Sequence, residues 1–220
     1  MAMIPDPAPA PRYAPDDPTY RPVAPAPPSP PAPPAPPAKA SPNKSAMKLI
    51  VPAVIGGLVA LSLGVYGNLH EGTLVAVNVA GFSNAIRAKA WLATFAFVFA
   101  LVQLVSALAM YGKLPGIHAP SWTGTLHRWS GRIAFLLAVP VAIHCLYALG
   151  FEWSSPRIII HSLLGCFFFG FFTVKMLVLS RRGMPGWALP VFGGLVFTGL
   201  AGLWLTSSLY FFWHTGSLKF

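Results

Sequence analysis

From Lys48 onward, long apolar runs alternate with short stretches that hold most of the polar and charged residues. Five such runs cover about residues 49–66, 90–111, 133–150, 158–179 and 187–212. At 1.5 Å per residue, an α-helix of roughly 20 residues crosses a hydrocarbon core of about 30 Å. The pattern therefore predicts an all-α fold, an integral membrane bundle of about five transmembrane helices over residues 48–220.

The first 47 residues contain no such run and consist largely of proline and alanine. They hold 17 of the 24 prolines of the chain, in stretches such as 25–31. A segment of this composition buries too little apolar surface to offset the entropy lost when its backbone is ordered. We therefore predict a disordered, Pro-rich N-terminal tail over residues 1–47 that acts as a solvated tether on the cytoplasmic side.

The composition agrees with a lipid bilayer as the surroundings of the apolar region. Hydrophobic residues make up 55% of the chain and charged residues 9%, too few to coat a soluble domain of this size. The net charge of +10 does not indicate nucleic-acid binding, because the basic residues lie at the ends of the apolar runs and form no patch with aromatic residues. Cys145 and Cys166 fall inside apolar runs and are expected to be buried thiols.

The basic residues also predict an orientation, because cytoplasmic loops of membrane proteins carry an excess of Lys and Arg. With the N-terminus in the cytoplasm, and counting from residue 39 onward, nine basic residues lie on or near the cytoplasmic side: Lys39, Lys44, Lys48, Lys113, Arg128, Arg132, Lys175, Arg181 and Arg182. Four lie on the other side: Arg87, Lys89, Arg157 and Lys219. We therefore expect the N-terminus inside and the C-terminus outside.

Ionisable residues inside spans are costly and are therefore candidates for function. His144 lies six residues before Gly150, the end of the third run, and His161 lies four residues after Arg157, the start of the fourth. On antiparallel helices these positions lie about 9 Å and about 6 Å below the same, outer surface. His70 follows the first run and lies at this surface as well. Three imidazoles are thus expected at one end of the bundle.

Neutral imidazoles that face each other in an apolar bundle suit haem b, whose iron takes two axial histidines. We predict a haem b in the outer leaflet with His144 and His161 as axial ligands and His70 as the alternative partner. Gly165, four residues after His161, would leave room for the macrocycle on the same helix face. The other interpretation is that His144 and His161 only hydrogen-bond neighbouring helices.

His127 precedes the third run, on the expected cytoplasmic side, and is followed four residues later by Gly131. His-x-x-x-Gly therefore occurs twice, at 127–131 and at 161–165. A second, inner haem at His127 would need another imidazole there, and only His118 offers one. Alternatively, His127 is an interfacial residue that meets haem propionates or lipid phosphates.

The two His-x-x-x-Gly elements resemble those of bacterial b-type cytochromes of the cytochrome b561 and ferric-reductase-like kind, in which such elements bind haem. More closely, residues 49–213 resemble an uncharacterised bacterial family of small five-span membrane proteins, which implies a bacterial cell membrane. The matching stretches are 66–70, 127–132, 140–145, 161–166 and 204–208. The histidines of this chain cluster in the outer leaflet, whereas the pattern of the cytochrome b561 family has two histidine pairs, one in each leaflet.

These features together favour a haem-b membrane electron carrier or the membrane anchor of a redox complex, an electron-transfer subunit rather than a stand-alone enzyme. Quinol in the membrane and an extracytoplasmic redox protein would be its partners. One alternative is a cofactor-free structural or assembly subunit. Another is a small transporter or a divalent-metal site built from His70, His144 and His161.

The expected orientation can be tested with reporter fusions. A reporter that is active only in the cytoplasm should be active when fused ahead of Met1 and inactive when fused after Phe220, because five spans place the two ends on opposite sides. Whole-cell reporter activity measures this, and immunoblots of both fusions control for expression. Activity at the C-terminus with none at the N-terminus would refute the orientation.

Overall fold

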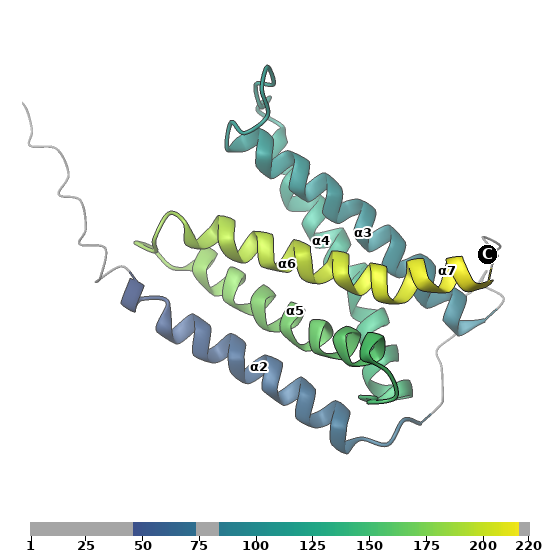
Figure 1. The fold of residues 1–220 in the computed structure, drawn as a ribbon. Coiled ribbons are helices and arrows are strands. Elements are labelled where there is room, and N and C mark those ends of the chain that lie inside the picture. The colour runs from purple at the N-terminus through teal and green to yellow at the C-terminus, as the bar shows by residue number, and fades with distance from the viewer. Residues whose placement is uncertain (1–45, 74–83, 216–220) are drawn as a thin grey trace, which may run out of the picture. The chain divides into compact units, whose positions relative to one another are not determined.

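The computed structural model describes residues 46–73 and 84–215, so most of the predicted tail, residues 1–45, lies outside the described residues. The described part is all-helical, as predicted (Figure 1). Its elements are α2 (Ile50–Leu69), α3 (Ala85–Met110), α4 (Thr123–Ile143), η1 (His144–Leu149), α5 (Pro156–Ser180), α6 (Ala188–Trp204), η2 (Leu205–Leu209) and α7 (Tyr210–Thr215). The two η elements are π-helical turns that continue the helices before them.

Within residues 46–73 and 84–215, five helical stretches are long and apolar enough to cross a membrane: Ile50–Leu69, Ala85–Met110, Thr123–Leu149, Pro156–Ser180 and Ala188–Thr215. Large apolar side chains cover their outer surfaces, among them Leu61, Leu136 and Leu179, which are 61%, 68% and 60% exposed. Such a surface is stable in lipid and not in water. The chain is therefore a multi-pass membrane protein.

Two helices begin earlier than the apolar runs suggested. α4 begins at Thr123 and not near residue 133, because its first turns are amphipathic: Ser130 is buried, while Arg128 is exposed. α3 begins at Ala85 and not at 90, because the side chain of Asn84 caps it by accepting from the Arg87 backbone N–H at 2.9 Å. Both shifts bring ionisable residues into the helices.

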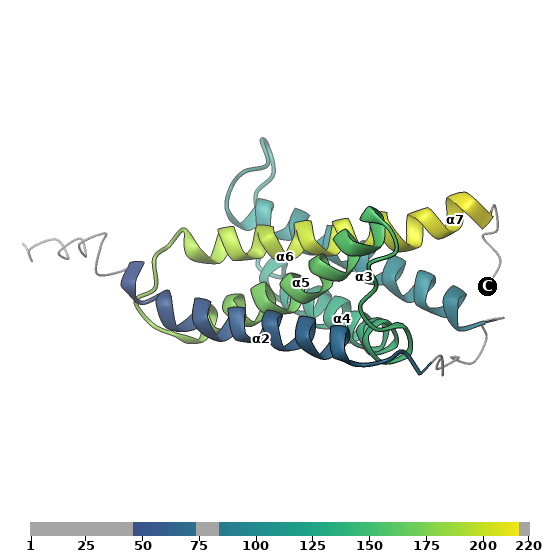
Figure 2. The same ribbon diagram turned by 60° about the horizontal axis from the view of Figure 1, so that its bottom comes forward.

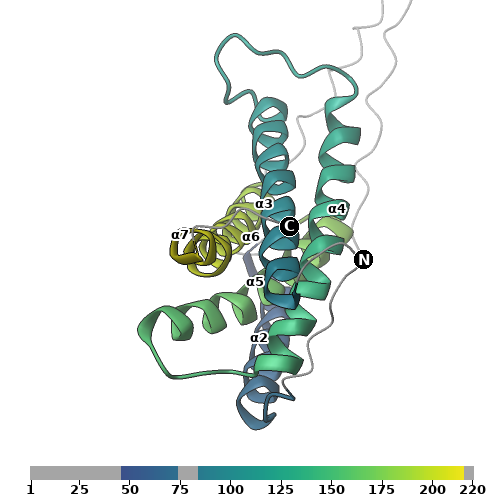
Figure 3. The same ribbon diagram turned by 90° about the vertical axis from the view of Figure 1, so that its right-hand side faces the viewer.

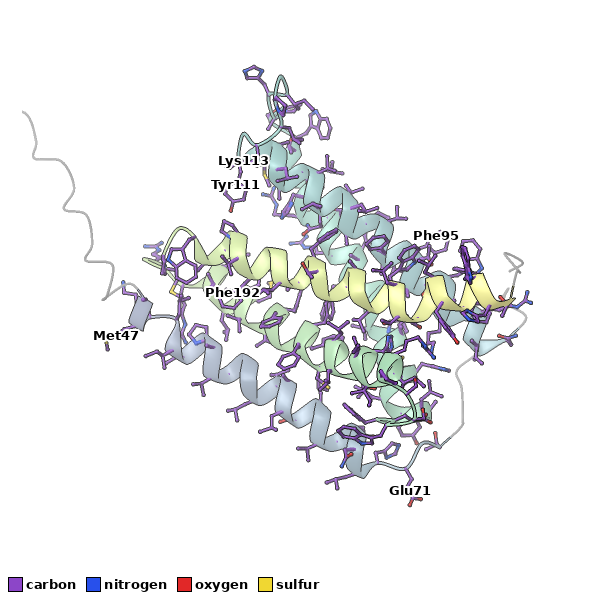
Figure 4. All side chains as sticks on the ribbon, viewed as in Figure 1. Met47, Glu71, Phe95, Tyr111, Lys113 and Phe192 are labelled. Carbon is purple, nitrogen blue, oxygen red and sulfur yellow. The ribbon has the colours of Figure 1, made fainter. Side chains whose placement is uncertain are left out.

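Consecutive helices run antiparallel, so α2, η1 and α7 end where α3 and α5 begin. We call this the His161 end of the bundle. Helices α2, α5 and α6 lie side by side (Figures 1 and 2), and α3 packs along α4 (Figure 3) and also contacts α6. Glu71 lies at the His161 end, and Tyr111 and Lys113 lie at the opposite end (Figure 4). At the His161 end α2 also contacts η1, the turn that continues α4.

Small residues set where the helices meet. α2 and α5 approach most closely at Gly56 and Gly170, where a Cβ on Gly170 would lie 2.8 Å from the Gly56 carbonyl oxygen and 3.0 Å from the Ala60 Cβ. The central core packs Ala100 and Ala138 against Phe168 and Leu200. Helices in lipid associate through such close packing, since lipid tails are as apolar as the helix surfaces.

The His161 end is tied together by backbone hydrogen bonds between distant segments. The Phe151 N–H donates to the Gly67 carbonyl at 2.7 Å, and the Thr73 N–H donates to the Tyr147 carbonyl at 3.2 Å. Gly150 has a φ of 73°, a conformation that favours glycine, and it ends η1 against the end of α2. These bonds hold η1 beside the cavity described next.

Candidate functional site

A cavity of about 300 Å³ lies inside the bundle near the His161 end, between α3, α4 with η1, α5 and α6 with η2. Its wall is mostly apolar and includes small residues such as Ala96 and Ala138 and the rings of Phe168 and Trp204. Its charged, imidazole and hydroxyl-bearing residues are Lys89, Glu152, Arg157, His161, Ser162 and Ser207, and the thiols of Cys145 and Cys166 also line it. An apolar pocket with a few polar groups is the usual form of a small-molecule or cofactor site.

His161 lines this cavity from α5, and its tautomer follows from its hydrogen bond. Its Nδ1 lies 2.9 Å from the Thr206 hydroxyl oxygen. That hydroxyl already donates its only proton to the helix, to the Gly202 carbonyl at 2.7 Å. With that proton on the carbonyl, Thr206 accepts from His161, an assignment that places the imidazole proton on Nδ1 and leaves a lone pair on Nε2. Histidines that bind metals through Nε2 use this arrangement.

Thr206 also links His161 to the cation that precedes it on α5. Its carbonyl accepts a 2.6 Å hydrogen bond from Arg157 Nη1, and the guanidinium lies 3.9 Å from the centre of the Tyr210 ring. Thr206 belongs to the π-helical turn η2, and π-helical turns often occur at functional sites. In the same turn Ser208 is fully buried, and its hydroxyl has no hydrogen-bond partner in the described part of the chain.

His144 is the first residue of η1 and is 8% exposed. Among residues 46–73 and 84–215 its imidazole makes no hydrogen bond. The cavity lining includes its neighbour Cys145 but not His144 itself. Lys89, in the first turns of α3, interacts electrostatically with both His144 and His161. The predicted pair therefore lies near one cation at one end of the bundle, but only His161 reaches the cavity in this arrangement.

His70 lies just beyond α2 and is already engaged. Its Nε2 lies 3.1 Å from the Tyr147 carbonyl oxygen, to which it must donate. Its ring stacks between the rings of Tyr66 and Tyr147, with centroids 5.0 and 5.2 Å away. These contacts connect α2 to η1 and engage the Nε2 of His70.

His127 lies in α4, not before it as the sequence suggested. Its Nδ1–H donates to the Ser106 hydroxyl at 2.9 Å, because that hydroxyl donates its own proton to the Gln103 carbonyl at 3.0 Å. The Gln103 side-chain amide in turn donates to the His127 carbonyl. His127 thus has the same tautomer as His161 but joins α3 to α4 in the other half of the bundle.

The two glycines of the repeated His-x-x-x-Gly element have different surroundings. A Cβ on Gly131 would lie 2.5 Å from Gln103 Nε2, so this glycine makes room for the side chain that holds His127. A Cβ on Gly165 would have one neighbour within 4 Å, Leu203 Cδ2 at 3.9 Å. Gly165 lines the cavity, whereas Gly131 does not. Only the second element therefore leaves open space beside its histidine.

Three residues at the site were not predicted from the sequence. Lys89 lies just before residue 90, where the second span was expected to begin, and Arg157 marked only the orientation and the start of the fourth run. Thr206 was noted without a role, although three consecutive hydroxyl residues at 206–208 inside an apolar span are a signal of function.

The proposed three-histidine metal site finds no support in the arrangement. No group of three or more His, Cys, Asp or Glu side chains is placed to hold a metal ion among the residues described. Haem needs no such group, since the porphyrin supplies four of the ligands and the protein one or two.

Residues 49–219 match the model of a protein family described as a family of unknown function (DUF6529). No curated protein and no solved structure matches the chain.

The two glycines should respond differently to the same substitution. Gly131→Ala should destabilise the bundle by about 1–3 kcal/mol, because the new methyl group displaces the Gln103 amide from the His127 carbonyl. Gly165→Ala should have little effect, because its Cβ meets only Leu203 at an ordinary contact distance. The unfolding midpoints of the two variants are compared in the same detergent. Alanine raises the helix propensity equally at both positions, so this gain cancels in the comparison. Equal unfolding midpoints would contradict the distinction.

Proposed function

The chain belongs to this family of unknown function, and we propose that it is a haem-b membrane electron carrier or the membrane anchor of a redox complex. The observation that supports this most is the geometry of His161. Thr206 fixes its proton on Nδ1, and the unprotonated Nε2 belongs to a side chain that lines an apolar cavity. A neutral, oriented imidazole in a water-poor slot is what an axial haem ligand requires.

The surroundings of His161 are compatible with a flat macrocycle. Gly165 leaves open space on the same helix face, and Phe168 and Trp204 provide apolar rings in the wall. The cavity of about 300 Å³ is smaller than a whole haem, so the rest of the group would lie between α4 and α5. Those helices meet mainly through side chains such as the stacked pair Phe135 and Phe172, whose centroids are 4.2 Å apart.

His144 is the proposed second ligand. Its imidazole is buried without a hydrogen bond to any described residue, and an unpartnered polar group in an apolar bundle is costly. Its neighbour Cys145 already lines the cavity, so a different rotamer of His144 would be needed to face His161. Because no hydrogen bond holds the present rotamer, that rotation breaks none.

The cavity is lined by two cations and by one carboxylate, that of Glu152. Lys89 enters from α3 and Arg157 from α5, so the His161 end carries a positive balance suited to the two haem propionates. When bound, haem b would supply a single-electron Fe(III)/Fe(II) couple. The protein would supply the axial nitrogens, the cations and the exclusion of water.

In the predicted orientation the His161 end faces away from the cytoplasm of a bacterial cell. Haem held there would exchange electrons with an extracytoplasmic redox protein on one side and with membrane quinol on the other. His127 is not part of this site. Its hydrogen bonds to Ser106 and Gln103 support a role in joining α3 to α4 rather than a second haem.

Single substitutions test the proposal. His161→Ala and His144→Ala should each abolish the low-spin signal in the reduced-minus-oxidised absorption spectrum or convert it to a high-spin one, because each removes one axial nitrogen. His70→Ala should leave the signal intact, because its Nε2 is bonded to the Tyr147 carbonyl. His127→Ala should also leave it intact.

His214→Ala is the matched control, because His214 is an exposed histidine whose Nδ1 bonds within its own helix, to Tyr210. Size-exclusion profiles verify that each variant is folded. A low-spin signal that survives His161→Ala contradicts the proposed ligand. Wild-type protein from haem-replete cells without haem absorption would overturn the function, and a cofactor-free structural or assembly subunit would replace it.

A further inference from the structure

A second hollow, of about 700 Å³, runs between α2 and α5 on the outside of the bundle. It extends along α2 from Ala53 to Leu69, which is about 24 Å at 1.5 Å per residue. Its sides include Leu61, 61% exposed, and Phe167, 49% exposed, so the groove is open to the lipid. Phe192 reaches it from α6 (Figure 4).

The groove exists because its floor lacks side chains. A Cβ on Gly57 would have no neighbour within 4 Å among the described residues, and one on Gly64 would lie 3.7 Å from the Cys166 Sγ. The nearby contact between Gly56 and Gly170 holds the two helices together and so keeps the groove in one shape. A long apolar chain would therefore fit along α2 without moving the backbone.

The groove adjoins the cavity that contains His161. Cys166 and Phe151 line both hollows, so these two side chains form a shared wall. A molecule in the groove would lie one side chain away from the proposed haem. This continuity distinguishes the groove from an ordinary depression on a lipid-facing surface.

The lining favours a neutral head group. At the His161 end Trp153 Nε1 donates to the Asn68 Oδ1 at 3.1 Å, which leaves the Asn68 amide hydrogens available to an acceptor. Among the described residues that line the groove none is charged, so a phospholipid phosphate would find no cation there. A quinone carbonyl needs only a hydrogen-bond donor.

We infer that this groove binds an isoprenoid quinol, with its tail along α2 and α5 and its head group at Asn68. The inference rests on the proposed function, for which it names the electron donor. Oxidation of the quinol to quinone breaks two O–H bonds and releases two protons to water at the His161 end. The proposed haem would accept the two electrons one at a time, and the extracytoplasmic redox protein would be the oxidant that takes each of them on.

Equilibrium dialysis of detergent-purified protein with a decyl-substituted benzoquinone tests the binding without reference to haem. Wild-type protein should bind it saturably. Gly57→Phe should weaken binding at least tenfold, because the ring fills the floor of the groove. Gly194→Phe on α6 is the matched control, because its Cβ also has no neighbour within 4 Å and it lines neither hollow. Circular dichroism and size-exclusion profiles show that both variants are folded.

Asn68→Leu provides a second variant at an exposed position; it removes the amide hydrogens offered to the quinone and also the acceptor of the Trp153 Nε1 hydrogen bond. It should weaken quinone binding and leave the binding of a decyl phosphocholine unchanged. The quinol assignment would be overturned in favour of an ordinary lipid contact by either of two results. One is that decyl phosphocholine competes for the groove as well as the quinone does. The other is that Gly57→Phe and Gly194→Phe lose quinone binding to the same extent. Saturable quinone binding by protein without haem would support the quinol-binding groove and contradict the haem electron carrier. Haem in a protein that does not bind quinone saturably would contradict the groove and support the electron carrier.

Discussion

The structure depends first on how helices associate in a bilayer, where the lipid tails are as apolar as the helix surfaces. Burial of apolar surface gives little driving force between helices in a bilayer, so association depends on close packing and on hydrogen bonds. Gly56 and Gly170 bring α2 onto α5, and alanines occupy much of the core between α3, α4 and α6. Where small residues leave space that no neighbour fills, a cavity and a groove remain.

The same constraint governs the polar residues inside the spans. His127 and His161 each give their Nδ1 proton to a hydroxyl that is itself bonded to a helix carbonyl. Such interhelical bonds average about 0.6 kcal/mol in membranes, too little for one to hold the bundle together. Their main effect is orientation. At His127 the surrounding space is filled by Gln103, whereas Gly165 leaves the space beside His161 open.

The sequence was sufficient for the five apolar helices and for the convergence of His144 and His161 on one end, because span length and residue spacing determine both. It placed the start of α4 ten residues late, because hydropathy marks where a helix becomes apolar and not where its hydrogen bonding begins. It also treated the two His-x-x-x-Gly elements alike. Their difference depends on Gln103, which lies on another helix and fills the space beside Gly131, so nothing within either element shows it.

The proposed haem ligation is tested most directly by electron–nuclear double resonance on oxidised, detergent-purified protein labelled with ¹⁵N at one ring position of histidine. A low-spin ferric signal should appear with strong coupling from the Nε2 label and weak coupling from the Nδ1 label, because Thr206 holds the Nδ1 proton of His161. Strong coupling from the Nδ1 label alone, or no low-spin ferric signal in folded protein, would contradict it.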